Sequence, residues 1–474
     1  MPDTISLFSG GMDSLAGVVW DVVQNGKKPL LVSHYPSVRH RARQKLLATQ
    51  LSKAGLGWSF PQARAQASLK DRHLDLENTQ RARAILYLTL GFVVASKLKI
   101  RQLRMYENGV VALNLPVTGQ SVSSTLTRTS HPRFLNAFQD FANRLLAANV
   151  EISNPFLCLT RTQIVERLKN CNGARFIPAS TSCAHIYMMD NAHPHCGLCS
   201  QCLDRQIAII NHQFLDQDTA YRFDPFVDDP TIFPEQTFGK ALSMGYFGTH
   251  LRIGSLNEPA FYQEFVDVYD ALHYMPMPFD RAERAVYELF QRQSKDVERA
   301  FKAMRAKHDN QLLRGKLPKD CLLRTVGAGL HLEPPVKLAA DRLSQIADDG
   351  LHATFRNRKP KNEIEVQDSL EGIFIPLKER IEREFPVYCV LHLKGVRPDF
   401  SNGQALAIEV KYIYGKNRTP QKIVEEMGAD ISHYKGKVGG VLFVVYDPEK
   451  KIVDSERFRE ECLKHPNVYL KLIQ

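Results

Sequence analysis

A short polar loop near the start of the chain carries residues suited to phosphate chemistry. Residues 9–14 read Ser-Gly-Gly-Met-Asp-Ser and follow the apolar run Ile5–Phe8. A strand that ends in a small-residue turn and leads into a helix directs backbone N–H groups at an anion. Gly10 and Gly11 permit close backbone approach, and Asp13 offers a carboxylate to a magnesium ion. The loop predicts a nucleotide site; an ordinary glycine turn is the structural alternative.

Four cysteines gather within a short stretch in the middle of the chain. Cys183 is followed at a distance by Cys196, Cys199 and Cys202, which are separated by two-residue gaps. Such tight turns bring thiolates into one coordination sphere, which suits tetrahedral zinc. Buried thiols and an iron–sulfur cluster are the alternatives. Zinc is favoured because nothing else in the sequence suggests redox chemistry.

A third group of chemically capable residues lies toward the C-terminus. Asp399 follows a proline, and Glu409 and Lys411 lie two residues apart in the run Ala405–Lys411. Alternate residues of a strand share a face, so the glutamate and the lysine point to one side of a sheet. Two carboxylates on adjacent strands could bind one divalent ion, which generates a nucleophilic water that the lysine helps to orient. An edge strand with alternating charge is the alternative.

The segments around the first loop alternate between strand-like and helix-like patterns up to about residue 180. The expected strands are Ile5–Phe8, Pro29–Tyr35, Leu103–Tyr106 and Val110–Leu115, and the expected helices are Asp13–Gln24, Arg39–Lys53, Gln80–Leu98 and Pro132–Ala148. This alternation predicts a doubly wound parallel α/β sheet. Ligands bind beyond the carboxyl ends of such strands, where the loop would lie.

The rest of the chain is expected to form two further parts. Residues 226–350 are predicted to be a mostly helical connector, with helical periodicity in Pro259–Leu272, Asp280–Gln293 and Lys295–Lys307. Residues 351–474 are predicted to be a second α/β domain. Its expected elements are the helices Glu363–Glu384 and Thr419–Tyr434 and the strands Val387–Leu393, Ala405–Lys411 and Gly440–Tyr446. The N-terminal part, which contains the predicted parallel sheet, would span residues 1–225.

Composition narrows the possible partners. The chain has 474 residues, a net charge of +11 and a pI near 9.1, which favours an anionic partner such as a nucleotide or nucleic acid. Basic residues gather in the stretch 356–361, beside the second candidate site. No apolar run approaches the roughly 20 residues that span a bilayer. A cytoplasmic protein with no membrane partner is therefore expected.

The two N-terminal motifs together resemble the 7-cyano-7-deazaguanine synthase family of PP-loop ATP pyrophosphatases, over about residues 1–225. The lack of a Gly-x-x-x-x-Gly-Lys-Ser/Thr string agrees with this. The resemblance implies AMP and pyrophosphate formation from ATP during adenylation of a deazaguanine-type or related acyl substrate. It implies an ATP and magnesium site at Ser9, Gly10, Gly11, Asp13 and Ser14, and a zinc site at the four cysteines, with Arg205 following.

Two polar segments, Glu107–Gly109 and Thr127–Pro132, look more like the divergent members of that family found in bacterial antiviral defence loci. This resemblance implies a defence role and partner proteins from the same operon. It leaves the acyl substrate open.

Pro398-Asp399 followed by Glu409-x-Lys411 resembles the PD-(D/E)xK nuclease superfamily, and the acidic helix that starts at Glu363 resembles its restriction-endonuclease-like branch. The resemblance implies DNA as substrate and Mg²⁺ held by Asp399 and Glu409. It also implies that Lys411 is catalytic and that Glu365 is a further metal ligand.

Three functions are compatible with these motifs. The expected one is an ATP-dependent adenylating enzyme joined to a metal-dependent DNA nuclease. A nucleotide sensor that gates the nuclease without making a small-molecule product is the first alternative, and release of AMP and pyrophosphate would argue against it. A non-catalytic nucleic-acid-binding scaffold is the second.

Overall fold

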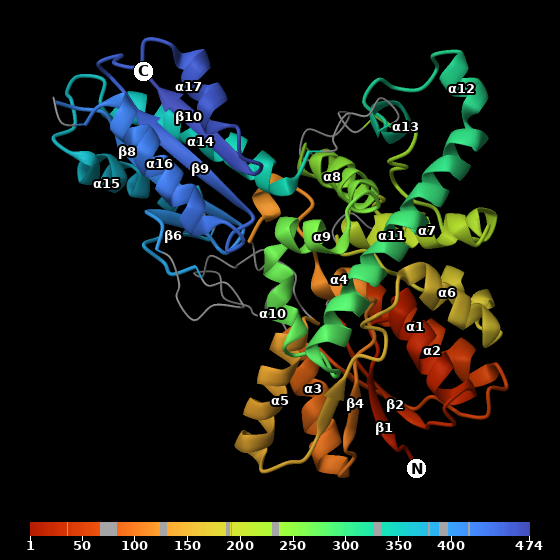
Figure 1. Ribbon diagram of the computed structural model, residues 1–474. Helices are drawn as coiled ribbons and strands as arrows, with labels where there is room; N and C mark the ends of the chain where they lie inside the picture. Colours follow the sequence, from red (N-terminus) through yellow and green to blue (C-terminus); the bar gives the residue numbers. More distant parts are fainter. Residues whose placement is uncertain are drawn as a thin grey trace. The chain divides into compact units, whose positions relative to one another are not determined.

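The structure is a computed structural model of the 474-residue chain. It describes residues 1–35, 37–66, 83–123, 130–185, 190, 192–229, 237–326, 333–377, 380–387, 397–415 and 418–474. The expected strand Val387–Leu393, apart from its first residue, and the segment 127–129 lie outside the described residues. Figure 1 gives the order of the elements along the chain.

The N-terminal sheet is parallel throughout and has the strand order β3-β2-β1-β4-β5. Its strands are β1 (Thr4–Leu7), β2 (Pro29–His34), β3 (Gln62–Ala65), β4 (Gln102–Arg104) and β5 (Glu151–Ser153). β1 lies in the centre, where Ile5 aligns with Leu30 of β2 and Leu103 of β4. The expected parallel α/β fold is confirmed.

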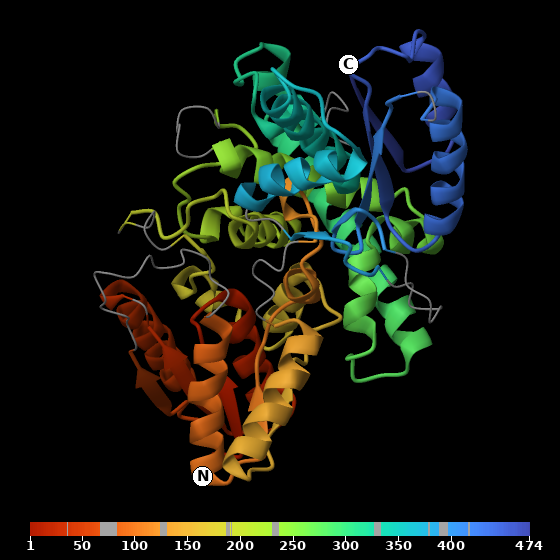
Figure 2. The ribbon, with the colours of Figure 1, turned by 90° about the vertical axis from the view of Figure 1, so that its left-hand side faces the viewer.

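Helices cover both faces of this sheet. They are α1 (Met12–Val23), α2 (Val38–Lys53), α3 (Arg83–Leu98), α5 (Pro132–Leu146), α6 (Arg161–Asn170) and α7 (Ser200–Asn211). Residues of α1, α2, α6 and α7 pack into one core, and residues of α3 and α5 pack with Ile5 and Leu7 into another. α3 and α5, orange and amber, lie side by side (Figures 1 and 2). The sheet is therefore doubly wound.

The run Val110–Leu115 is a short helix, α4 (Gly109–Leu113), and the predicted strand there is wrong. Asn108 caps this helix, because its side-chain oxygen accepts a hydrogen bond from the N–H of Val111 at 3.0 Å. A brief apolar run does not distinguish a buried strand from a buried helix. The Asn108 cap is the local feature that favours the helix here.

The middle of the chain is helical in its described parts. Its helices are α8 (Thr237–Ile253), α9 (Glu258–Glu264), α10 (Tyr269–Leu272), α11 (Phe279–Lys307), α12 (Asp309–Leu313) and α13 (Leu322–Thr325). The two helices predicted between residues 280 and 307 form the single helix α11, since no glycine or proline interrupts it.

The C-terminal sheet has the order β10-β9-β8-β7-β6, with β8, β9 and β10 parallel and β6, β7 and β8 antiparallel. Its strands are β6 (Ile381–Arg383), β7 (Phe400–Asn402), β8 (Leu406–Tyr412), β9 (Gly440–Tyr446) and β10 (Val468–Ile473). The helices are α14 (Pro335–Thr354), α15 (Glu363–Phe374), α16 (Pro420–Tyr434) and α17 (Ser455–Cys462). α14 and α15 pack on one face of the sheet, and α16 and α17 on the other.

The helix predicted to run from Glu363 to Glu384 is shorter than expected. α15 ends at Phe374, and β6 begins at Ile381. Pro376 explains the stop, because proline lacks the N–H that a continuing helix needs and restricts the residue before it.

Packing divides the chain into two compact units. The first comprises residues 1–115, 126–255 and 270–332, and the second residues 116–125, 256–269 and 333–474. The chain thus passes between the units several times, and the division into three consecutive domains stays a prediction. No helix in the described part of the chain has the length and apolar character needed to cross a bilayer.

Candidate functional sites

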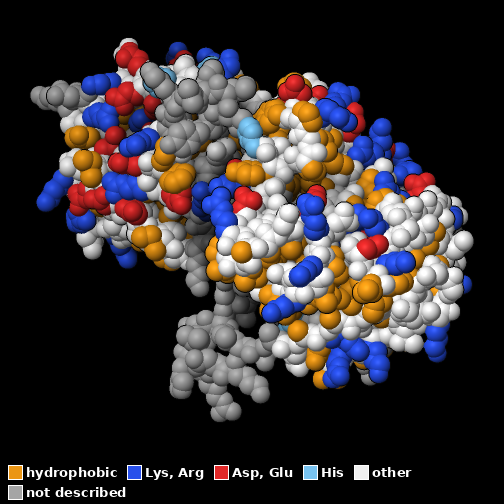
Figure 3. All heavy atoms as spheres, turned by 90° about the horizontal axis from the view of Figure 1, so that it is seen from below, with side chains coloured by type: hydrophobic (Ala, Val, Ile, Leu, Met, Phe, Trp, Pro, Cys, Tyr) orange, Lys and Arg blue, Asp and Glu red, His pale blue; other side chains and the backbone are white. Residues whose placement is uncertain are grey.

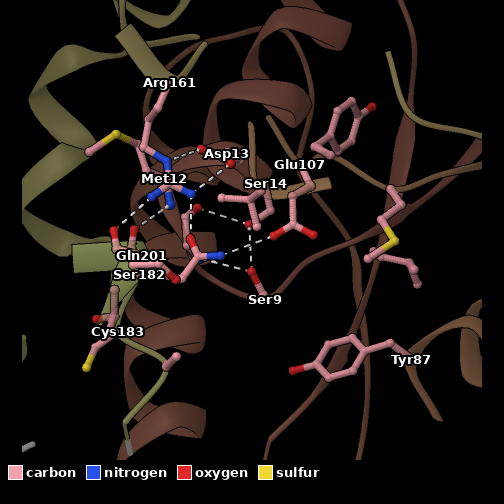
Figure 4. A pocket seen from close by; sticks show the side chains of 18 of the residues that line it. Ser9, Met12, Asp13, Ser14, Tyr87, Glu107, Arg161, Ser182, Cys183 and Gln201 are labelled. Carbon is pink, nitrogen blue, oxygen red and sulfur yellow. Dashed lines mark hydrogen bonds and ion pairs between the residues drawn. The ribbon is translucent and has the colours of Figure 1, made fainter. Parts of the chain in front are cut away.

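The loop of residues 9–14 lies at the carboxyl end of β1, as the sequence predicts. Gly10 has a φ of +83°, a left-handed conformation that glycine adopts without strain. The Ser9 hydroxyl accepts a hydrogen bond from the N–H of Gly11 at 3.2 Å and lies 3.2 Å from the hydroxyl of Ser14. The two serines therefore turn toward each other at the start of α1 (Figure 4).

Asp13, the acidic residue of the loop, is held by Arg161 and Asn108. It is buried, and its two carboxylate oxygens accept hydrogen bonds from Nε and Nη2 of Arg161 at 2.9 and 3.0 Å. The backbone and side-chain nitrogens of Asn108 donate to the same carboxylate at 3.1 and 2.8 Å. The Asp13 carboxylate thus accepts four hydrogen bonds and also lines the pocket beside the loop, and its expected role as a magnesium ligand stays a prediction. Its part in nucleotide binding stays a prediction.

A buried polar network extends from Asp13 into the helices of the middle region. Arg161 also pairs with Asp204 at 3.4 Å, and Asp204 accepts hydrogen bonds from Tyr246 of α8 and Gln293 of α11, both at 3.1 Å. Burial alone would lower the pKa of Arg161, but Asp13 and Asp204 raise it above its usual value. α8 and α11 therefore help to hold the charged groups beside the loop.

A pocket of about 230 Å³ opens beside the loop. Figure 4 shows Glu107 and Gln201 among the side chains that line it together with the loop. Glu107 accepts a hydrogen bond from the Ser130 hydroxyl at 2.6 Å and lies 3.4 Å from the amide of Gln201. Other lining residues are Leu7, His40, Tyr87, Met105, Tyr106, Val111, Asn114, Thr181 and Ser182. The predicted loop and the expected Glu107 segment thus meet at one cavity.

The four cysteines form a compact buried cluster. Their sulfur atoms all lie within 4.8 Å of one another, and those of Cys196 and Cys202 are 3.8 Å apart. Tetrahedral zinc with Zn–S bonds of about 2.3 Å would set the sulfurs about 3.8 Å apart. Gly197 has a φ of +84°, and a Cβ there would lie 1.7 Å from the carbonyl oxygen of Phe223. The donor set and spacing fit zinc.

The cysteine arm, which comprises residues 181–202, begins with residues that contact the loop of residues 9–14. The N–H of Thr181 donates to the carbonyl of Gly10 at 2.8 Å, and the Ser182 hydroxyl lies 3.4 Å from the N–H of Met12. Cys183 follows directly and lines the same pocket. Arg205, fully buried, donates to the Ser182 hydroxyl at 3.3 Å and pairs with Asp218 at 2.5 Å. The cysteine cluster therefore braces one wall of the pocket.

Arg43 is a cation near this site that the sequence analysis did not single out; it contacts Thr181, which lines the pocket, but is not itself a lining residue. It lies on α2, and its guanidinium donates to the Thr181 hydroxyl at 3.2 Å. Burial lowers the pKa of Arg43, and the nearby positive charge of Arg205 lowers it further. Gln44, the next residue, donates to the carbonyl of Ser9 at 3.0 Å and so fixes α2 against the loop. Arg43 is placed to attract an anion.

The C-terminal unit brings together the three predicted nuclease residues. Asp399 precedes β7, and its carboxylate accepts the N–H of Val410 on β8 at 2.8 Å. The ammonium of Lys411 lies 3.5 Å from the Glu409 carboxylate. Burial and the neighbouring charge of Asp399 raise the pKa of Glu409 to about 8, and burial raises that of Asp399. Two close, buried carboxylates of this kind fit a divalent cation.

Glu365 does not join this group. It pairs with Arg358 and accepts the N–H of Lys361 at 2.6 Å, on the exposed side of α15. Glu363 lies closer to the site: it accepts the N–H of Tyr412 at 2.9 Å, and the charges of Asp399 and Lys411 act on its pKa, which burial raises. The expectation that Glu365 is a ligand therefore lacks support in the geometry, since the helix turns it away.

The helical periodicity of α15 could have identified Glu363 from the sequence. It precedes the buried residues Val366, Leu370 and Phe374 by three, seven and eleven positions, which places it on the face of α15 that packs on the sheet. Two residues of α16, Asp430 and Tyr434, were missed in the same way. They share a helix face with the buried residues Ile423 and Met427.

Two family comparisons match this chain. Residues 349–471 match the family model described as REase_DpnII-MboI, and residues 128–213 match the model described as Queuosine biosynthesis protein QueC. Both family resemblances are confirmed over these ranges. The QueC match includes the four cysteines and Arg161 but begins after the loop of residues 9–14, and the DpnII-MboI match includes Asp399, Glu409 and Lys411. No curated protein matches the chain.

The QueC-like and DpnII-MboI-like regions support a nucleotide-utilising enzyme fused to a nuclease. Net charge alone does not locate the nucleic-acid surface. On the face shown in Figure 3, the Lys and Arg side chains of the described residues are scattered among acidic, apolar and uncharged groups. Within the basic stretch, Arg358 and Lys359 already pair with Glu365 and Glu449.

Proposed function

We propose that the N-terminal unit binds ATP at residues 9–14 and releases AMP and pyrophosphate while it adenylates a deazaguanine-type or related acyl substrate. The observation that carries this proposal is the meeting of the loop, Glu107 and the cysteine arm at one pocket. The match to the QueC family model supports the same chemistry. Loop N–H groups and the hydroxyls of Ser9 and Ser14 would bind phosphate oxygens.

The remaining residues of this site have supporting tasks. Arg43 would bind a phosphate oxygen in place of the lysine that a P-loop supplies. Asp13 and Arg161 would hold the first turn of α1 in place rather than bind metal, so any magnesium would arrive with the nucleotide and take its ligands from the phosphates. Zinc at the four cysteines would be structural, because all four ligands are protein thiolates and leave no open position.

We propose that the C-terminal unit is a Mg²⁺-dependent DNA endonuclease. The convergence of Asp399, Glu409 and Lys411 carries this proposal, and the DpnII-MboI match supports it. Asp399 and Glu409 would hold the ion, which generates a nucleophilic water and offsets charge on the phosphate. Lys411 would orient or deprotonate that water. Joined to the N-terminal activity, such a nuclease suits a role in bacterial antiviral defence.

The ATP reaction is tested by supplying the full-length protein with ATP, Mg²⁺ and 7-carboxy-7-deazaguanine and measuring AMP, pyrophosphate and product mass. Arg43→Gln should raise KM for ATP about tenfold or more, because a charge-assisted hydrogen bond is lost. Lys45→Gln removes the same charge from the exposed side of α2 and serves as the control. Binding of ATP without release of AMP or pyrophosphate would instead favour the nucleotide sensor.

The nuclease is tested on the full-length protein with duplex DNA and Mg²⁺ or Mn²⁺, with and without ATP. Glu409→Ala should abolish cleavage through loss of a metal ligand, and Lys411→Ala should leave only a small residual rate of cleavage without loss of metal. DNA affinity should survive both changes and fall steeply with salt, because backbone contacts dominate it. A wild-type protein that binds DNA under all these conditions without cutting it would leave the scaffold as the explanation.

A further inference from the structure

Lys411 lies between two acidic side chains from different elements. Its ammonium is 3.5 Å from the Glu409 carboxylate on the same strand and 2.8 Å from the carboxylate of Asp430 on α16. The side chain of Lys411 is only 10% exposed, so its orientation depends on these partners rather than on water. Asp430 makes the shorter of the two ion pairs.

Asp430 is poorly placed to be a third metal ligand. Among the described residues, the four cysteines form the one group of three or more Cys, His, Asp or Glu whose ligand atoms all lie within 4.8 Å of one another. Asp399, Glu409 and Asp430 therefore do not make such a group. The nearest charged partner of Asp430 is the lysine, which assigns it to orientation of the ammonium.

The face of α16 that packs on β8 supports this arrangement. Residues 407, 409 and 411 point to the side of the sheet covered by α16, where Ala407 packs with Ile423 and Met427. Tyr434 lies one turn after Asp430, and its hydroxyl donates to the Glu409 carboxylate. One helix face thus contacts both the glutamate and the lysine of the strand.

We propose that Asp430 is a positioning residue of the nuclease, which holds the Lys411 ammonium beside the metal-binding carboxylates, while Tyr434 orients Glu409. This inference rests on the proposed nuclease function. A divalent ion would compete with Lys411 for the Glu409 carboxylate, because both are cations that seek the same oxygens. Asp430 then remains as the anion that keeps the lysine in place.

A double-mutant cycle on the full-length protein tests the proposal. Asp430→Asn should lower the single-turnover cleavage rate about tenfold or more, with little change in the Kd for DNA. The same change in a Lys411→Ala background should have no further effect on the residual rate, because Asp430 acts through the lysine. Asp430→Glu keeps the charge and should cleave faster than Asp430→Asn. Glu425→Gln, on the exposed side of α16, is the control for loss of one charge.

The outcomes separate this inference from the function on which it rests. No cleavage by the wild-type protein would overturn the nuclease and the positioning role together. Cleavage by Asp430→Asn at the wild-type rate, or equal losses in both backgrounds, would overturn the positioning role alone. A lowered thermal midpoint for Asp430→Asn together with Asp430→Glu no faster than it would assign Asp430 to folding and also overturn the proposal.

Discussion

Asp13 illustrates how one residue can matter to a site through its charge partner. Asp13→Ala would leave the buried guanidinium of Arg161 with Asp204 as its one remaining ion-pair partner among the described residues. Removing one member of a buried ion pair costs about 3–5 kcal/mol of unfolding free energy. We expect the variant to lose stability as well as AMP formation, measured by denaturant unfolding. Asp140→Ala on the exposed side of α5 should change stability by about 0.5 kcal/mol or less.

The unfolding measurement also tests the geometry. If Asp13→Ala lost AMP formation at full stability, Asp13 would act on the nucleotide or its metal directly, as the sequence alone suggests. Asp13→Asn keeps the size of the side chain and should fall between the two, because it retains one acceptor for Arg161.

Residue types and short spacings predicted the site members better than their roles. Glu409 and Lys411 share a face of β8 because strand alternation is a local rule that sequence reveals, and the antiparallel pairing of β7 with β8 brings Asp399 to them. The partner of Asp13 could not be found in this way, since Arg161 lies 148 positions away and only tertiary packing joins them. Long-range ion pairs leave no periodic signal.

At the scale of the element, the cysteine cluster includes the start of α7. Cys199 precedes α7 directly, and Cys202 lies in its first turn. We expect about one zinc per chain by elemental analysis. Cys199→Ser should lower zinc content and the thermal midpoint, because structural zinc contributes to folding free energy. Cys158→Ser, a half-buried cysteine outside the cluster, should retain the zinc. Iron with visible absorption would point to an iron–sulfur cluster.

Elements with strong periodicity were predicted well, and their limits and the short ones were not. β9 runs from Gly440 to Tyr446 as expected, since a buried parallel strand is a continuous apolar run. Two elements beside the candidate sites, α4 and α15, have weaker sequence signals. α4 was mistaken for a strand although Asn108 marks its start, and the stop of α15 depended on Pro376.

At the scale of the whole molecule, the second unit includes a segment from far earlier in the chain. Residues 116–125 follow α4, whose neighbour Asn114 lines the pocket beside the loop of residues 9–14, yet they belong to the unit that holds the candidate nuclease residues. The Ser123 hydroxyl donates to the carbonyl of Asn402, at the end of β7, at 2.6 Å. A Cβ on Gly119 would lie 2.8 Å from the backbone of α14. No local sequence pattern in residues 116–125 indicates that they belong to the second unit, so the sequence analysis assigned them to the first domain.

Val122 joins this segment to the hydrophobic core of the second unit. It is 2% exposed and packs in the core that contains Phe400, Leu406 and Leu343 of α14. Val122→Asp would place an unpaired carboxylate in that core, at a cost of several kcal/mol. We expect the variant to lose DNA cleavage and to unfold its second unit at lower temperature, while it keeps about one zinc per chain. Val453→Asp makes the same change on a side chain of that unit that is 95% exposed, and it should behave as the wild type.

A Val122→Asp protein with normal cleavage and unfolding would show that residues 116–125 do not support the nuclease fold. The expected loss would also mean that an isolated fragment from residue 351 lacks two supports, because Val122 and the buried Val336, Ala339 and Leu343 of α14 all lie outside it.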